Sequence, residues 1–155
     1  MKLAFHKGSR GTLFSKLICW KTGEPYSHVE LVFDFKITPA LSLCFSADEK
    51  DGGTRFKEID LNDEWLLVDV PETVANFKKA FNYARKHNNL KYDWLGIIGF
   101  VLPFGEHDDN DRFCSEIVCE ILQVSLGWWP EVKPWQVSPG RLYELYAAKF
   151  FNVSH

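Results

Sequence analysis

The order of strand-like and helix-like segments constrains the fold of this chain more than any other feature of its sequence. Short segments rich in β-branched and apolar residues predict five strands, at residues 2–6, 27–33, 41–46, 54–60 and 64–70. The last of these is apolar on both faces and is therefore predicted to be a central strand. Between the strands, residues 34–38 with Pro39 predict one turn, and an Asp-Gly-Gly sequence within residues 47–53 predicts another.

Apolar residues recur at helical spacing in most of the remaining chain. This spacing predicts helices over residues 13–21, 71–88, 93–102 and 112–125, and a last helix that starts at Pro139. No internal repeat and no linker divides these segments. With 155 residues, the chain is expected to form a single domain over residues 1–155.

Composition narrows the class of protein and its partners. A hydrophobic content of 46% and an aromatic content of 15% argue against a disordered chain. The net charge of −3 provides no basic surface, so no nucleic-acid partner is expected. The apolar run at residues 94–104 is shorter than the roughly 20 residues that a membrane span requires. It is predicted to be a buried helix, with a segment that dips into a membrane as the alternative.

The N-terminal residues and the cysteines predict a cytoplasmic location. The first eleven residues contain neither the apolar region nor the cleavage site of a standard signal peptide. The cysteines are few for a chain that can build its own core, so they are expected to be reduced; they are Cys19, Cys44, Cys114 and Cys119.

Cys114 is the first candidate for a functional residue. It stands where a loop leads into the predicted helix 112–125, and Asp111 as N-cap would make it the third helical residue. The positive end of the helix macrodipole favours a thiolate there. The alternative is a small buried hydrophobic residue, which is the common fate of a free cysteine.

A histidine suited to act with Cys114 lies in the second predicted strand. If the second and third strands form a hairpin centred near residue 37, His28 faces Ser46 and Glu30 faces Cys44. Strand alternation places these four residues on one face and an apolar set on the other. The four are too polar for an ordinary core, so we expect them to line a cleft. The alternative for His28 alone is a half-buried strand histidine.

These residue types together predict nucleophilic catalysis. Cys114 would attack a carbonyl carbon while His28 takes the thiol proton and later returns it to the leaving group. A third group should orient the imidazole. Glu30 has the right chemistry but lies about 6–7 Å along the strand, whereas Ser46 has the right position but is a weaker acceptor. The backbone N–H of Cys114 is the expected oxyanion donor.

Other classes of site fit the sequence less well. The five histidines form no metal-binding pair at helical spacing, and no zinc-finger spacing is present. The acidic loop 105–112 lacks the ligand spacing of a calcium loop and is predicted to be a surface loop. Ser115 has no surrounding nucleophile elbow, and no phosphate-binding loop is found. We therefore expect neither a metal ion nor a cofactor.

Four motifs resemble the circularly permuted papain-like superfamily: SHVEL at 27–31, FS at 45–46, KYDWLG at 91–96 and FCSEIV at 113–118. That superfamily includes relatives of bacterial cell-wall cysteine peptidases and of lecithin–retinol acyltransferase. The chain looks most like its small members encoded by tailed bacteriophages. The resemblance spans residues 2–145. It implies an α+β fold with a central, mainly antiparallel sheet and the nucleophile helix packed against it.

Carried over by residue, the resemblance implies that Cys114 is the nucleophile and His28 the base. The third polar residue of the family corresponds to Ser46, where a histidine or an acidic residue is more usual, so Glu30 remains a candidate on its chemistry. Tyr92 with Asp93 matches a Tyr-Asp pair near the cleft, for which packing and helix capping are the alternative. Tyr26 and Tyr92 are the candidate substrate-binding residues.

Three functions follow as hypotheses. The first is a thiol hydrolase that cleaves an amide or ester bond through an acyl-thioester. The second is an acyltransferase on the same fold, and the third is a non-catalytic phage or virion module whose site is no longer used. The substrate would be a small molecule, a peptide or a lipid. A phage-encoded protein would work in the host cytoplasm or in the virion.

Overall fold

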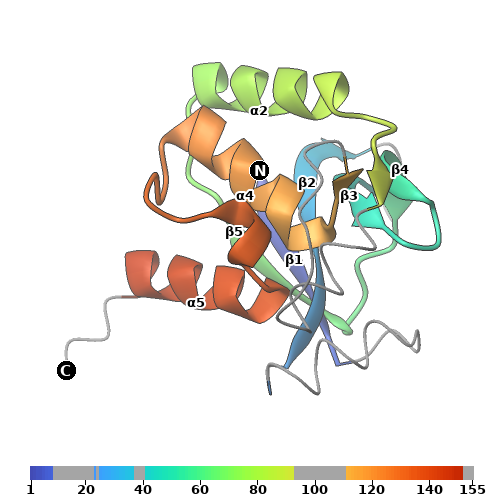
Figure 1. Ribbon diagram of the computed structural model, residues 1–155, viewed down its shortest axis with the longest axis horizontal. Coiled ribbons are helices and arrows are strands. Elements are labelled where there is room, and N and C mark those ends of the chain that lie inside the picture. Colours follow the sequence, from blue (N-terminus) through green and yellow to red (C-terminus); the bar gives the residue numbers. More distant parts are fainter. Residues whose placement is uncertain (9–22, 24, 37–40, 93–110, 152–155) are drawn as a thin grey trace.

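A seven-stranded sheet forms the centre of the computed structural model, which describes residues 1–8, 23, 25–36, 41–92 and 111–151 (Figure 1). Its order is β5-β1-β2-β3-β4-β6-β7. The strands are β1 (Lys2–Lys7), β2 (Tyr26–Lys36), β3 (Ser42–Asp48), β4 (Gly53–Ile59), β5 (Trp65–Asp69), β6 (Lys91–Tyr92) and β7 (Asp111–Arg112). Every neighbouring pair is antiparallel except β6 with β7, which is parallel.

Among the described residues, three α-helices accompany the sheet: α2 (Val74–Lys86), α4 (Cys114–Leu126) and α5 (Pro139–Phe150). A short 3-10 helix, η1 (Pro134–Gln136), precedes α5. Helix α4 lies between α2 and α5 and packs against β2 and β3 (Figure 1). The predicted α+β class, with the Cys114 helix against a mainly antiparallel sheet, is confirmed. None of the helices among the described residues is long and apolar enough to cross a membrane.

Local sequence signals explain where these helices begin and end. Thr73 caps α2, because its hydroxyl accepts a hydrogen bond from the Asn76 N–H while the Asn76 side chain accepts one from the Thr73 N–H. Ser138 caps α5 and is followed by a proline in the first turn. Helix α4 ends at Gly127, whose φ of 66° is in the left-handed region that glycine adopts without strain.

One face of the sheet is apolar over most of its length, whereas the opposite face combines a small apolar cluster with polar residues. The main core joins β1, β2 and β3 to α4 through fully buried side chains that include Phe5, Phe33, Phe45, Ile117 and Leu122. Each contributes about 1.5–3 kcal/mol by its burial. On the opposite face, a smaller cluster contains Ala4, Val32 and Cys44, with Trp65 packed against it. The polar residues of the candidate site belong to this second face.

The structure corrects several boundaries predicted from the sequence. Residues 34–36 continue β2 rather than forming a turn, and α2 begins at Val74 rather than at residue 71. Strand β5 lies at the edge of the described sheet and is not central. Its apolar residues cover the core from one side only, and Leu67 is 42% exposed. The predicted helices 13–21 and 93–102 and the loop 105–110 lie outside the described residues.

The predicted hairpin register is wrong by two residues. In the β2–β3 ladder, Leu31 pairs with Phe45 and Val32 with Cys44, one full alternation farther along β3 than expected. Asp48 therefore takes the place expected for Ser46. Because side chains alternate with a period of two, a shift of two residues leaves the even-numbered side chains on one face. The predicted grouping of the polar residues on that face therefore holds, although their facing partners change.

Candidate active site

Cys114 is the first residue of α4 and is 2% exposed. The N-cap is Phe113, not the predicted Asp111, which belongs to β7. Helix α4 thus starts two residues later than expected, and Cys114 occupies the first rather than the third helical position. The Glu116 carboxylate accepts a hydrogen bond from the Phe113 N–H at 3.4 Å. The first N–H groups of a helix have no intrahelical acceptor, so the start of α4 offers backbone donors beside the thiol.

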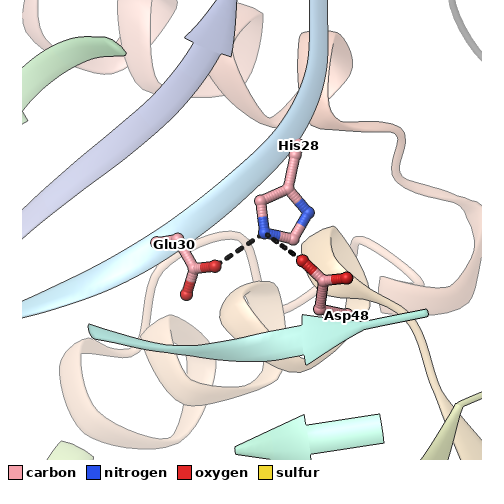
Figure 2. Close-up of side chains that lie close together, drawn as sticks. All are labelled: His28, Glu30 and Asp48. Carbon is pink, nitrogen blue, oxygen red and sulfur yellow. Dashed lines mark hydrogen bonds and ion pairs between the residues drawn. The ribbon is translucent and has the colours of Figure 1, made fainter. Parts of the chain in front are cut away.

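His28 connects the thiol to two carboxylates. Its Nε2 lies 2.7 Å from Glu30 Oε1 and 4.0 Å from Asp48 Oδ2 (Figure 2). The His28 side chain also forms a hydrogen bond with the Cys114 thiol. Because Nε2 faces the carboxylates, we assign Nδ1 to the thiol. The structure thus brings Cys114, His28 and Glu30 together, although Cys114 is distant from the other two in sequence.

The charge of His28 is set by its surroundings. The imidazole is 5% exposed, and burial alone would lower its pKa. The charge and hydrogen bond of Cys114, followed by those of Glu30, outweigh burial and raise the pKa from 6.5 to about 9. This direction favours the imidazolium form of His28, which is the form that a thiolate nucleophile beside it would require.

Glu30 is fully buried and still ionised. Burial works against the charge, but the hydrogen bonds and charges of His28 and Arg55 lower its pKa below the usual 4.5. Arg55 donates from Nη1 to Glu30 Oε2 at 2.9 Å and from Nη2 to Glu30 Oε1 at 2.7 Å. Glu30 therefore forms hydrogen bonds with both His28 and Arg55. The backbones of His28 and Glu30 were expected to lie about 6–7 Å apart along the strand, but their side chains approach one another closely enough to bond.

Ser46 is buried in the same region but turns elsewhere. Its hydroxyl donates to the Val29 carbonyl at 2.7 Å, and its own carbonyl accepts from Arg55 Nη1 at 3.4 Å. The hydroxyl therefore links β3 to β2 instead of approaching His28. Of the two candidates for the orienting group, the geometry favours Glu30.

The candidate substrate-binding residues are placed unequally. The ring of Tyr26, two residues before His28, is half-buried against Phe5 and Tyr143, with centroid distances of 5.4 and 4.8 Å. Burial and the neighbouring Tyr143 raise its pKa. Tyr92 belongs to β6, but its side chain and Asp93 lie outside what the structure describes.

Two other described cysteines differ from Cys114 in their surroundings. Burial, together with the charge of Glu30, raises the pKa of the Cys44 thiol. Burial, with the charges of Glu120 and Glu116, raises the pKa of Cys119 to about 12. Both thiols remain protonated at neutral pH, which makes them natural controls for Cys114.

Sequence reasoning missed Asp48 and Arg55. Strands β3 and β4 pair with Ser46 opposite Arg55 and Asp48 opposite Gly53. The Asp-Gly-Gly turn signal, extended as a hairpin on both sides, would have placed Arg55 across from the polar residues of β3. The signal was present, but its consequence for the site depended on the register.

His28, Glu30 and Asp48 also form a possible metal cluster, with one potential ligand atom from each within 4.8 Å of the others. A guanidinium nitrogen already occupies this region. Arg55 Nη2 lies 2.7 Å from Glu30 Oε1 and 3.7 Å from Asp48 Oδ2. A divalent ion there would meet a fixed positive charge and would have to displace a bidentate ion pair. The residues present therefore do not fit a metal ion.

Comparisons with known proteins show similarity to solved structures alone. No model of a known protein family matches the chain, and no curated protein matches it. Among solved structures, the chain is similar to the metalloprotein YiiX from Escherichia coli O157:H7, described as DUF1105, with a TM-score of 0.60 and 21% identity. The match covers 81% of this chain and 65% of the neighbour, which is under two thirds of that protein. At this identity the similarity supports the fold alone.

Proposed function

We propose that this protein is a cysteine-dependent hydrolase of the permuted papain-like type, which cleaves an amide or ester bond through an acyl-thioester. One observation carries the proposal. A cysteine at the first position of a helix contacts a buried histidine, and that histidine also meets a buried, ionised carboxylate. Nucleophile, base and orienting group are thus arranged as in a catalytic triad.

In the first half of the reaction, the Cys114 thiolate attacks the carbonyl carbon and forms a C–S bond. The negative charge that develops on the carbonyl oxygen is stabilised by backbone N–H groups at the start of α4. The tetrahedral species collapses as the bond to the leaving nitrogen or oxygen breaks. The His28 imidazolium donates its proton to that leaving group, which leaves a neutral imidazole and an acyl-thioester.

In the second half, neutral His28 accepts a proton from water, and the resulting nucleophile attacks the thioester. The C–S bond breaks, the acid product leaves, and the thiolate–imidazolium pair is restored. Glu30 holds the imidazole in one orientation through both halves, and its charge favours the imidazolium. The substrate remains a small molecule, a peptide or a lipid, with the cytoplasm of a cell or phage host as the expected place of action.

Acyl transfer is the second candidate, and the burial of the site favours it. Cys114 and His28 are 2% and 5% exposed. A thioester formed in a site that excludes water persists longer, which gives another acceptor time to attack. The non-catalytic alternative would leave Cys114 without elevated reactivity.

The structural neighbour is named a metalloprotein, which raises the question of a metal ion in this chain. The cluster of His28, Glu30 and Asp48 is the place where this chain would bind an ion, but Arg55 fills it. No step of the proposed reaction therefore involves a metal.

The experiment that tests the function begins with labelling by an iodoacetamide probe at about pH 6, where an ordinary thiol with a pKa of about 8.5 is protonated. We expect rapid labelling that Cys114→Ala abolishes and that the matched control Cys119→Ala, in the same helix, leaves intact. Incubation with aryl esters and peptide anilides, followed by intact-mass analysis, should then reveal an acylated Cys114. If Cys114 is labelled no faster than the other cysteines, the proposal of an enzyme is refuted and the non-catalytic module is favoured.

The same acyl-enzyme separates the two catalytic candidates. Release of the acyl group by water alone supports the hydrolase. Release that requires an added amine or alcohol, with the acyl group recovered on that acceptor, supports the transferase.

A further inference from the structure

Arg55 lies close to three carboxylates near the site, those of Glu30, Asp48 and Asp51. Besides its two bonds to Glu30, it donates from Nε to Asp51 Oδ2 at 2.8 Å, and its Nη2 lies 3.7 Å from Asp48 Oδ2. Its side chain is 11% exposed. By contrast, Arg141 pairs with Glu144 on the surface, where both side chains are more than half exposed. The arginine at position 55 is thus a buried clamp, whereas the arginine at position 141 belongs to an ordinary surface pair.

The charges around His28 explain why such a clamp is needed. Two buried carboxylates, those of Glu30 and Asp48, approach one imidazole. A single imidazolium cannot balance two buried anions, and an uncompensated buried carboxylate takes up a proton. A neutral Glu30 would no longer favour the imidazolium, and the Cys114–His28 pair would lose its support.

We propose that Arg55 is a positioning residue that acts as the built-in cation of this cluster. It keeps Glu30 charged and aimed at His28, and it occupies the position that a divalent metal ion would need. The link to catalysis rests on the proposed function, but the link to Glu30 does not.

The shape of the guanidinium suits this role better than a lysine would. Its planar fork meets both oxygens of Glu30 at once, which fixes the plane of the carboxylate as well as its charge. Its Nε remains available for Asp51, which in turn accepts two bonds from Lys57 at 2.8 Å. On the solvent side, the Arg55 guanidinium is therefore held in place by Asp51, which is itself paired with Lys57.

In the part of the chain that the structure describes, few titratable or charged groups face Glu30. On its own strand there is His28, while β3 contributes Cys44 and Asp48, β4 contributes Arg55, and β1 presents Ala4, which carries no charge. Helix α4 acts on Glu30 through the contact of Cys114 with His28. A change in the protonation of Glu30 on removal of Arg55 can therefore be assigned to this set.

The test compares Arg55→Gln and Arg55→Lys with the matched control Arg141→Gln, which removes an exposed ion pair. The titration of the Glu30 carboxyl is followed by carbon-13 NMR and assigned with Glu30→Gln. We expect Arg55→Gln to move the Glu30 midpoint upward by at least about one pH unit, equivalent to a tenfold change in proton affinity. Arg55→Lys should move it less, because it keeps the charge and loses the fork. Arg141→Gln should leave it in place.

The rate of Cys114 alkylation as a function of pH gives the second readout. Its acidic limb should move to higher pH in Arg55→Gln and return part of the way in Arg55→Lys, which a purely structural role would not produce. If Arg55→Gln does not fold, Asp51→Asn loosens the clamp without removing the buried charge, and it should move both readouts in the same direction by less. A Glu30 midpoint that responds to neither Arg55→Lys nor Asp51→Asn overturns the proposal.

The metal arm uses Cys114→Ala, which removes the thiol as a competing ligand. Titration of this variant with Co²⁺ should give no visible absorption from the cluster. Absorption that is lost in Cys114→Ala/His28→Ala would show that an ion, not Arg55, completes the cluster. A protein without hydrolytic activity in which Glu30 still responds to Arg55 would refute the function and retain the clamp. An active enzyme indifferent to Arg55 would do the reverse.

Discussion

Replacing Cys114 by alanine should change the titration of a different residue, His28. The thiol supplies the two largest influences that raise the pKa of His28, by its charge and by its hydrogen bond. Glu30 supplies the remaining ones, and burial opposes all of them. In Cys114→Ala, burial and Glu30 stay while the thiol is gone. The pKa of His28 should therefore fall from about 9 towards or below its ordinary value.

The size of the effect follows from the difference between 6.5 and about 9. At about 1.4 kcal/mol per pH unit, this difference corresponds to roughly 3–4 kcal/mol of preference for the imidazolium. Most of that preference should disappear with the thiol, since the contribution of Cys114 exceeds that of Glu30. A shift of more than one pH unit is expected, well above the resolution of an NMR titration.

The assay is a titration of the His28 ring in protein labelled at histidine with carbon-13, from about pH 5 to 10, with the signal assigned by His28→Gln. Cys119→Ala serves as the control. It removes a buried thiol from the same helix, and among the described contacts none joins the Cys119 thiol to the imidazole. A midpoint near 6.5 in the parent protein, or the same midpoint in the parent and Cys114→Ala, would show that no thiol–imidazole coupling exists.

Three further predictions concern the surroundings of the pair. Because the pKa of Glu30 is lowered in the folded protein, its stabilising contribution is present above about pH 4.5 and is lost as the pH falls through the lower folded value; urea unfolding of Glu30→Gln should show a weaker loss of stability in acid than the parent. Ser46→Ala should lower the free energy of unfolding by about 1–3 kcal/mol, because the Ser46 hydroxyl donates to a buried carbonyl. It should leave turnover within tenfold of the parent, whereas Glu30→Gln should reduce turnover more than a hundredfold. Equal losses of turnover in the two variants would mean that the Ser46 hydroxyl also acts on the imidazole. Gly53→Ala should destabilise the protein by more than about 2 kcal/mol, because a Cβ at this position would lie 1.8 Å from the Leu90 carbonyl oxygen. A Cβ at Gly52 would meet open space, so Gly52→Ala should cost only about 1 kcal/mol of backbone strain. Thermal melts that rank the two variants the other way would contradict the packing of β4 against residue 90.

Local rules predicted a large part of this site. Alternation along a strand is a property of the backbone itself, so His28 and Glu30 had to share a face whatever they paired with. A loop followed by an amphipathic helix was enough to place Cys114 near a helix start, although the cap proved to be Phe113. The class of fold also followed from the resemblance of short motifs, and the sheet with α4 against it confirms that class.

The tertiary structure decided which of these residues meet. The β2–β3 register depends on how the whole sheet packs, and it differs by two residues from the predicted register. As a result, Asp48 lies near His28, and the Ser46 hydroxyl donates to the Val29 carbonyl instead. The contact of Arg55 with Glu30 depends on the position of a third strand, β4. The contact of His28 with Cys114 depends on the packing of α4 against the sheet. Backbone periodicity acts over a few residues and can be read from the sequence, whereas register and side-chain direction depend on packing between segments far apart in the chain, which only the folded structure specifies.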